Sequence, residues 1–300
     1  MVQIEVIRIL FLILFLAFVV GFILTMTSYS LSIAMTFFFL TASKATKYKA
    51  TFKRKCDPDW HKTSYRKSTQ VLCNGGVPAI LAIIYILSLY LSKQNQSSSP
   101  STYDKILDNK CIMSSSFSKT FESTTLMHLT ISILTSICSS CGDTLASELA
   151  PITHLGSPIL ITTGYTVPKG TNGGVTIIGL IYSLLGGLFV GVAYIISSLL
   201  LECNESISGS NISYFTLNLI LVISSFSGLL GSVIDSILGA IFQYSGYDTE
   251  KKCIAKQSHA MPKIVAIVDN FPIFDNNTVN LLSSCLITII MPYFFKALMP

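Results

Sequence analysis

Two carboxylates stand five residues apart in an otherwise small and apolar stretch, CGDTLASELAP at residues 141–151. Asp143 and Glu148 could together hold one hydrated divalent cation, because Mg²⁺ prefers one or two carboxylates plus waters and substrate phosphates. The alternative is that Asp143 caps a helix and Glu148 is a solvated residue in its second turn. The residues alone leave both interpretations open.

A glycine-rich segment, PKGTNGGVT at residues 168–176, directly precedes an apolar run. Its glycines permit positive φ angles and a close approach of backbone N–H groups to an anion. Lys169 supplies a formal charge, and the N-terminus of a following helix would add its dipole. The spacing is not that of a Walker A loop, so a simple loop-to-helix turn explains the segment equally well. The candidate phosphate-binding residues are Lys169, Gly170, Thr171, Asn172, Gly173 and Gly174.

Asp235 lies inside the apolar run of residues 215–242, in the stretch SGLLGSVIDSILGA. A carboxylate within a membrane span costs several kcal/mol, so such residues usually face a polar interior and act there. The flanking glycines are explained by close helix packing, which small residues allow. Asp235 is therefore a candidate catalytic residue, with a structural hydrogen bond to a neighbouring helix as the alternative.

The segment VDNFPIFDNNTVN at residues 268–280 is dense in carboxylate and amide side chains. Asp275, Asn276 and Asn280 are candidate binding residues for substrate or nucleotide, because such groups can bind a second metal, a ribose or a base edge. An Asx-rich turn followed by a helix cap explains part of this density without any ligand.

The elements that must position these residues are strongly apolar. The chain has 300 residues, of which 51% are hydrophobic and only 12% are charged, whereas ordinary soluble domains carry about 25% charged residues. The mean hydropathy of +0.63 argues against a soluble enzyme, and a net charge of +5 gives no sign of a nucleic-acid partner. The sequence predicts an all-α, polytopic transmembrane helix bundle of about seven spans in one integral membrane domain, residues 1–300. The predicted spans are residues 6–24, 29–42, 75–91, 124–141, 173–201, 215–242 and 279–295.

The orientation of these spans follows from the charges between them. The segment 43–67 is the densest in Lys and Arg, so the positive-inside rule makes it cytoplasmic. Counting onward, residues 142–172 and 243–278 are also cytoplasmic. The glycosylation triplets at Asn95, Asn204 and Asn211 then fall on the opposite side, in agreement with this orientation.

The basic segment has two interpretations. It acts as a topology signal alone, or its residues nearest the membrane, Lys44 and Lys47, touch an anionic head group. Lys44 and Lys47 are therefore candidate contacts for an anionic substrate or nucleotide.

Cysteine and histidine give no pattern typical of a metal site. Cys138 and Cys141 form a lone CxxC, which packing explains better than redox or metal chemistry. The four histidines have no ligand spacing. A metal bound by His and Cys is not expected.

Several motifs containing these residues occur in a fixed order: SKATKYK (43–49), CNGGVP (73–78), CGDTLASELAP (141–151), LITTGYTVPKGTNGGVT (160–176), SLLGG (183–187), GSVIDSILGA (231–240), QYSG (243–246) and DNNTVNLLSS (275–284). In these motifs the chain resembles the transmembrane protein 19 family, an integral membrane family also called domain of unknown function 92. The resemblance spans residues 18–292 and is specific because several motifs are long. The family pattern has a polar, Gly-rich stretch with an aspartate before the segment 19–25, so we expect an incomplete or divergent N-terminus at residues 1–18.

The resemblance implies phosphoryl transfer. The family includes the plant phytyl-phosphate kinase, which makes a prenyl diphosphate from a prenyl monophosphate and a nucleoside triphosphate. By this resemblance Asp143 and Glu148 would hold Mg²⁺, and the loop 169–174 would bind phosphates. Asp235 would orient a second metal or the acceptor phosphate, together with the Asp275, Asn276 and Asn280 group. The isoprenoid tail would lie between the spans, in an intracellular membrane such as the endoplasmic reticulum.

Two other classes of function fit the same residues. A membrane transporter would use Gly-interrupted spans and an intramembrane carboxylate, Asp235, along an ion or substrate pathway. A non-enzymatic membrane protein with a structural or assembly role would need none of these carboxylates for turnover.

Overall fold

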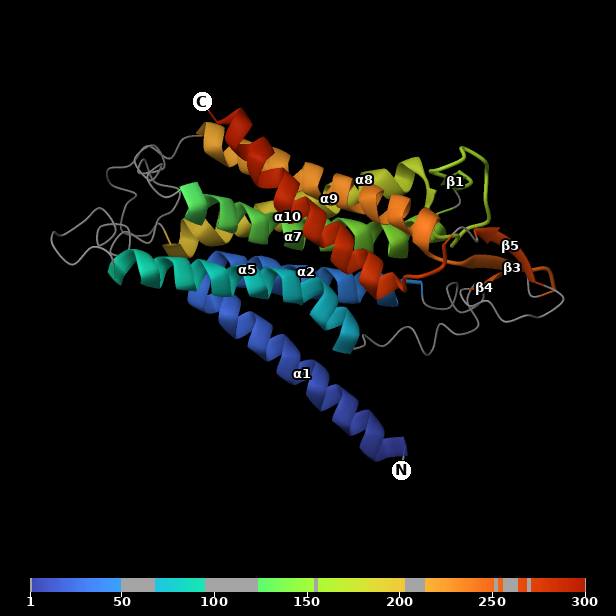
Figure 1. Ribbon diagram of the computed structural model, residues 1–300, viewed down its shortest axis with the longest axis horizontal. Coiled ribbons are helices and arrows are strands. Elements are labelled where there is room, and N and C mark those ends of the chain that lie inside the picture. Colours follow the sequence, from blue (N-terminus) through green and yellow to red (C-terminus); the bar gives the residue numbers. More distant parts are fainter. Residues whose placement is uncertain are drawn as a thin grey trace.

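The computed structural model describes residues 2–49, 68–94, 124–153, 156–202, 214–250, 253–255, 264–268 and 271–299. Within these residues the chain forms a bundle of α-helices, as predicted (Figure 1). The helices are α1 (Val2–Thr27), α2 (Tyr29–Lys47), α5 (Ser68–Gln94), α7 (Thr124–Leu149), α8 (Ile177–Ser197), α9 (Tyr214–Phe242) and α10 (Asn276–Leu298). The glycosylation triplets at Asn95, Asn204 and Asn211 and most of the basic segment 43–67 lie outside the described residues.

Among the residues that the structure describes, five helices are long and apolar enough to cross a membrane. Their spans are Thr69–Ser92, Thr124–Ile152, Ile177–Leu201, Tyr214–Phe242 and Asn276–Leu298. The described apolar part of α1, Phe11–Thr27, is shorter, and α2 ends in the polar sequence TASKATK. Five predicted spans are thus confirmed by length and composition, and residues 6–24 and 29–42 are helical, within α1 of 26 residues and α2 of 19 residues.

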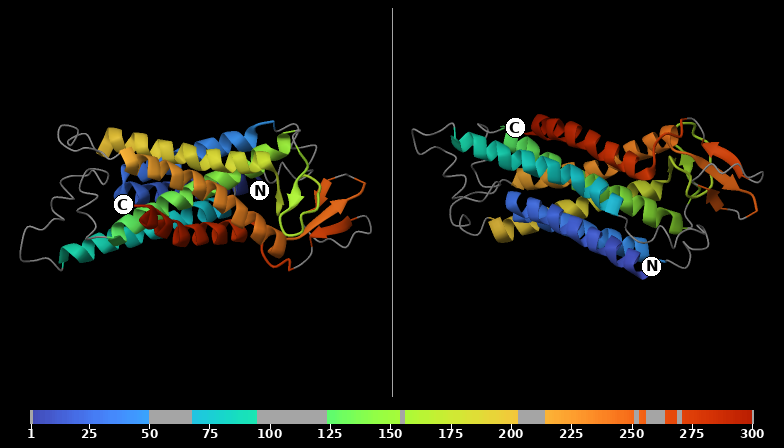
Figure 2. Two further views of the ribbon diagram at one scale, coloured as in Figure 1. Left: turned by 90° about the horizontal axis from the view of Figure 1, so that it is seen from above. Right: turned by 60° about the horizontal axis from the view of Figure 1, so that its bottom comes forward.

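The ends of the helices that flank the candidate residues meet at one end of the bundle. The C-terminal ends of α2, α7 and α9 and the N-terminal ends of α5, α8 and α10 lie there, and the chain's C-terminus lies at the other end (Figures 1 and 2). This arrangement agrees with the prediction that the segments 142–172 and 243–278 share one side of the membrane with the end of α2.

Two small antiparallel sheets stand at this same end and were not predicted. In the first, β1 (Ile159–Leu160) pairs with β2 (Gly174–Val175). In the second, β3 (Ser245–Asp248) lies between β4 (Cys253–Ala255) and β5 (Ile264–Val268). Strands this short carry too little alternation of apolar and polar residues to be seen in a sequence. Because β2 takes up two residues of the predicted span 173–201, the helix α8 begins only at Ile177.

The central helix of the bundle is α7, which packs against α2, α5, α8, α9 and α10. Ile133, Leu134 and Ile137 are among its fully buried side chains. Cys138 and Cys141 are free thiols buried on the same helix, in agreement with the packing interpretation of the CxxC. A helix surrounded in this way can place polar side chains only in a cavity or against a partner.

Glycines let the backbones of α7, α8 and α9 touch. A Cβ atom on Gly142 of α7 would lie 2.6 Å from the carbonyl oxygen of Ser183 and 2.7 Å from the Cα of Gly228. A Cβ on Gly186 of α8 would lie 2.8 Å from the Cα of Gly142. One on Gly231 of α9 would overlap the Ser139 side chain. Only residues without a side chain permit this packing, which small residues provide in membrane bundles.

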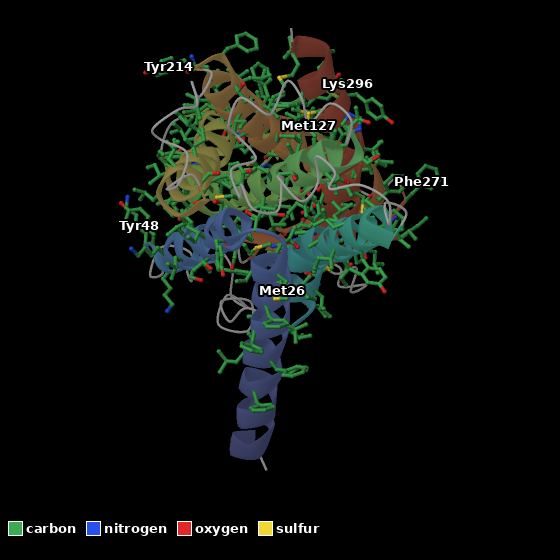
Figure 3. The ribbon with its side chains drawn as sticks, turned by 90° about the vertical axis from the view of Figure 1, so that its left-hand side faces the viewer. Met26, Tyr48, Met127, Tyr214, Phe271 and Lys296 are labelled. Carbon is green, nitrogen blue, oxygen red and sulfur yellow. The ribbon has the colours of Figure 1, made fainter. Side chains whose placement is uncertain are left out.

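The first helix leaves the bundle. Figure 3 shows α1 projecting away from the other helices, with Met26 near the end that joins them. Apolar side chains of its first part face outward, since Phe11 is 71% exposed and Phe18 is 69% exposed, whereas Val20 and Leu24 are buried. In a membrane protein such a surface faces lipid.

The glycine contact generates a prediction for stability. Gly142→Ala should lower the thermal unfolding midpoint of the detergent-solubilised protein, because the added methyl group must displace the backbones of both α8 and α9. Overpacking of this kind costs about 1–3 kcal/mol. Gly76→Ala is the matched control, since a Cβ there would meet nothing within 4 Å. Equal midpoints for the two variants would show that the close contact is not needed.

Candidate functional site

A polar cavity of about 300 Å³ opens at the end of the bundle that carries the two sheets. Six helices (α2, α5, α7, α8, α9 and α10) and the loop before α8 contribute to its lining, and most of the sequence-predicted residues meet there. Its polar lining includes Thr46 of α2, Gln70 and Asn74 of α5, Asp143, Thr144, Ser147 and Glu148 of α7, Lys169–Thr176, Ser232, Asp235 and Ser236 of α9 with Gln243 just after it, and Asn276 and Asn280 of α10.

Asp143 of α7 and Asp235 of α9 line the same cavity, and these two helices pack against each other. Asp143 lies within α7, which runs unbroken to Leu149, so the alternative that Asp143 caps a helix is wrong. Ser232 of α9 also lines the cavity, and it precedes Asp235 by about one turn. The two half-buried carboxylates interact electrostatically. The structure therefore brings together two carboxylates that are far apart in the chain.

Asp235 is also connected to α10. With its amide oriented to satisfy both ends, Asn280 donates from Nδ2 to Asp235 Oδ2 at 2.8 Å and to the carbonyl oxygen of Asn276 at 2.9 Å. The Ser283 hydroxyl, on the same helix, donates to the Asn280 carbonyl oxygen at 3.1 Å. The structural alternative for Asp235, a hydrogen bond to a neighbouring helix, is thus present. The carboxylate still lines the cavity, so the two roles are compatible.

Glu148 lines the cavity from another direction. Glu148 follows Asp143 by five residues, which places its side chain about 140° around the helix axis from that of Asp143. The two carboxylates therefore do not share one face of α7. Glu148 Oε1 accepts a hydrogen bond from Thr46 Oγ1 at 3.2 Å, which connects α7 to α2. Glu148 therefore enters the same cavity as Asp143 without forming a side-by-side pair with it.

At two positions the glycine-rich loop has the positive φ angle that its sequence predicted. Gly170 has φ of +92° and Gly173 has φ of +76°. A Cβ on Gly173 would overlap Ala240, so this glycine also allows the loop to rest on α9. The two donors of Asn172 are engaged, its backbone N–H with Ser245 Oγ at 3.0 Å and its Nδ2 with the Tyr244 carbonyl oxygen at 2.9 Å. The loop is thus held in place from outside the cavity.

The positive end of α8 borders the cavity next to this loop. Thr176 caps the helix by accepting the Gly179 N–H at 3.0 Å, and both residues line the cavity. The exposed Lys169 lines it too, while its Nζ donates to the Thr153 carbonyl oxygen at 2.6 Å. A helix N-terminus and an ammonium group both favour an anion at this position.

Asp275 has a structural role at the start of α10. Its side chain caps the helix by accepting the Thr278 N–H at 2.9 Å. Hydrogen bonds from the Thr278 hydroxyl and N–H lower the pKa of Asp275 below its usual value. Asp275 is exposed and does not line the cavity, whereas Asn276 and Asn280 do. The cap interpretation thus accounts for Asp275 but not for the two asparagines.

Lys44 and Lys47 do not reach the cavity. Both are exposed on the last turn of α2, where basic side chains favour the negative end of the helix dipole. Thr46, which lies between them, lines the cavity instead.

Three amide residues that line the cavity, Gln70, Asn74 and Gln243, were not predicted from the sequence. Asn74 is 9% exposed and Gln243 is 6% exposed, and neither side chain has a hydrogen-bond partner among the described residues. Pro78 lies inside α5 and has no N–H, so the carbonyl oxygen of Asn74 cannot receive its usual helical hydrogen bond. The first turns of α5 stand at an angle to the rest of the helix (Figure 1). A polar residue four positions before a proline within an apolar run was the signal that could have identified Asn74.

The described part of the chain holds no group of three or more His, Cys, Asp or Glu side chains placed to bind a metal. A metal in this cavity would therefore need amide oxygens, waters or phosphates besides one or two carboxylates. Such a ligand set is typical of Mg²⁺.

Comparison with known proteins gives the following relatives. The profile of the family described as "Integral membrane protein DUF92" matches residues 13–288. "Protein PGR" of Arabidopsis thaliana is 34% identical over 264 residues, which cover 86% of this chain and 80% of that protein. An uncharacterized membrane protein of Methanocaldococcus jannaschii is 30% identical over 117 residues, 39% of this chain and 41% of that protein. No solved structure matches significantly.

The capping role of Asp275 predicts a pH-dependent effect on stability. Asp275→Ala should destabilise the protein by about 1 kcal/mol at neutral pH, the usual cost of losing a helix cap. Because the pKa of Asp275 is lowered in the folded state, its charge stabilises the fold above the unfolded pKa of about 3.9 and ceases to do so as pH falls through the folded pKa.

Thermal unfolding midpoints at pH 7 and pH 3 measure this effect. The gap between the unmodified chain and Asp275→Ala should narrow at pH 3. Asp275→Asn is the control, since asparagine caps about as well but carries no charge. A gap that widens at low pH would contradict the assignment.

Proposed function

The chain belongs to the DUF92 family of integral membrane proteins, and from this premise we propose that it is a membrane phosphotransferase. In this proposal it transfers the γ-phosphoryl group of a nucleoside triphosphate to an isoprenoid monophosphate and forms a diphosphate. The observation that carries the proposal is the meeting of Asp143, Asp235 and the loop 169–174 in one polar cavity at the end of the bundle.

The proposed reaction needs positioning and charge neutralisation more than a strong base. An oxygen of the acceptor phosphate forms a bond to the γ-phosphorus, the bond from that phosphorus to its bridging oxygen breaks, and the nucleoside diphosphate leaves with the electron pair. The acceptor oxygen is already anionic at neutral pH, because the second pKa of a phosphate monoester is about 6. No residue of the cavity has to remove a proton.

The residues of the cavity form two groups, one suited to bind the cation of such a reaction and the other suited to bind the anionic phosphoryl group. Asp143 and Asp235 suit the divalent cation, proposed to be Mg²⁺, that neutralises the nucleotide phosphates. The N-terminus of α8 and the ammonium group of Lys169 suit the transferred group. Lys169 would exchange its hydrogen bond with the Thr153 carbonyl oxygen for one with a phosphate.

The surface of α8 supports a lipid acceptor. Ile177, Ile181 and Leu184 are 78%, 48% and 37% exposed and lie on one face of the helix by their spacing. This apolar face begins at the N-terminus of α8, beside the cavity. An isoprenoid tail could therefore lie in the membrane along α8 while its phosphate reaches the end of that helix. We propose an intracellular membrane, such as the endoplasmic reticulum, as the location.

A transporter is the second candidate, and a polar strip along α7 favours it. Ser136 and Ser284 share a hydrogen bond of 2.7 Å, and Ser132 donates to the Thr288 carbonyl oxygen at 2.8 Å. Buried hydroxyls at this depth are compatible with a pathway across the bundle. Transport of a solute into sealed vesicles that depends on Asp235 but needs no nucleotide would favour this candidate.

The test of the proposed function is phosphoryl transfer in membranes that contain the chain. Labelled ATP, CTP or GTP is supplied with farnesyl, geranylgeranyl or phytyl monophosphate, and the labelled diphosphate is measured. Asp143→Asn should reduce product more than about 100-fold, because charge neutralisation in a preorganised site is worth at least that factor.

Glu250→Gln is the matched control, since Glu250 is exposed in a turn and does not line the cavity. It should leave transfer unchanged. The absence of any labelled diphosphate from the folded, unmodified chain would refute the proposed function with these acceptors.

A further inference from the structure

We propose that Asp143 and Asp235 bind a single divalent cation between α7 and α9, in a site lined by oxygen atoms. The sequence had suggested Asp143 and Glu148, but the fold brings Asp235 to Asp143. The cation's part in catalysis rests on the proposed function, whereas its binding does not.

The two helices carry the carboxylates at the point where they are closest. Gly142, directly before Asp143, lies against Gly228 of α9, and Gly231 of α9 lies against Ser139 of α7. Asp143 and Ser232 both line the cavity, and Ser232 lies about one turn before Asp235. A cation held by both carboxylates would therefore join two backbones that already touch.

The charge of this region is unbalanced. Neither Asp143 nor Asp235 forms an ion pair with any residue that the structure describes, and the two carboxylates repel each other. Lys169, which lines the cavity, donates its hydrogen bond to the Thr153 carbonyl oxygen instead. Two like charges in a partly buried site are costly without a counter-charge. A divalent cation between them would supply it.

The unpartnered amides provide a separate indication of a ligand. Asn74 and Gln243 are more than nine-tenths buried, line the same cavity, and have no side-chain hydrogen-bond partner among the described residues. Since both amides line the cavity and are not engaged by the protein, they are available to a group that binds there. The Asn74 carbonyl oxygen also lacks the helical hydrogen bond that residue 78 would donate if it were not proline.

The chemistry of these groups selects the cation. Carboxylate, amide and carbonyl oxygens suit hard cations such as Mg²⁺ or Mn²⁺, which keep several waters that need hydrogen-bond acceptors. The Asn280 amide, which donates to Asp235 Oδ2, fixes the orientation of one carboxylate. Such a partner commonly tunes a metal ligand. Glu148 accepts the Thr46 hydroxyl hydrogen bond and is not needed as a ligand.

Binding of Mn²⁺ to the purified, full-length chain in detergent tests this proposal without nucleotide or turnover. The loss of the free Mn²⁺ signal in electron paramagnetic resonance gives the affinity and the number of ions bound. The unmodified chain should bind one ion, and Asp143→Asn and Asp235→Asn should each weaken binding at least about tenfold. Glu148→Gln should bind as tightly as the unmodified chain, which separates the proposed pair from the pair that the sequence suggested.

A second measurement guards against misfolded variants. Mn²⁺ should raise the thermal unfolding midpoint of the unmodified chain and of Glu148→Gln, but not of the two aspartate variants, whose midpoints without metal report their folding. Binding that survives either aspartate substitution, or that is lost equally in Glu148→Gln, would overturn the proposal. So would no binding by the unmodified chain. Binding with this pattern but without phosphoryl transfer would support the cation site and count against the proposed function alone.

Discussion

The close contact of α7, α8 and α9 through glycine is the constraint on which the site depends. In lipid the hydrophobic effect does not drive helices together, so their association relies on dispersion contacts that small residues make possible. Gly142, Gly186 and Gly228 meet at one level of the bundle. Asp143 follows directly after this contact and Asp235 follows about two turns after Gly228. A side chain at the contact would separate the carboxylates as well as the helices.

The same end of the bundle shows how a polar cavity is kept in shape inside an apolar protein. Its walls are held by hydrogen bonds that do not use the interior, such as those of Asn172 with Tyr244 and Ser245. The small sheets extend this support, since β2 pairs with β1 immediately before α8 begins. The amides of Asn74 and Gln243 are left for whatever enters. Rigidity outside the cavity and unpaired groups within it are what a binding site requires.

The sequence predicted the helices well and the partners within the site poorly, for a physical reason. A run of apolar residues reports directly that a segment is buried in lipid or protein, so the predicted span 215–242 nearly equals Tyr214–Phe242. Whether two carboxylates meet depends on helix phase and packing. Asp143 and Glu148 are close in sequence but turn to different sides of α7, while Asp235 arrives from another helix. Positive φ at Gly170 and Gly173 was predictable because it is a local property.

The charge of the cavity restricts how the proposed reaction could begin. Asp143, Asp235 and Glu148 line it, whereas Lys169 is the single basic side chain of the described lining, so acidic groups outnumber basic ones. The carboxylates would repel the phosphates of a free nucleoside triphosphate, and this repulsion is only weakly screened in a partly buried site. A nucleotide that arrives with its magnesium ion would not be repelled, nor would one that enters after the carboxylates have bound a cation. The acceptor could approach from the lipid side along α8, so the two phosphates would meet at the N-terminus of that helix, where its dipole favours negative charge.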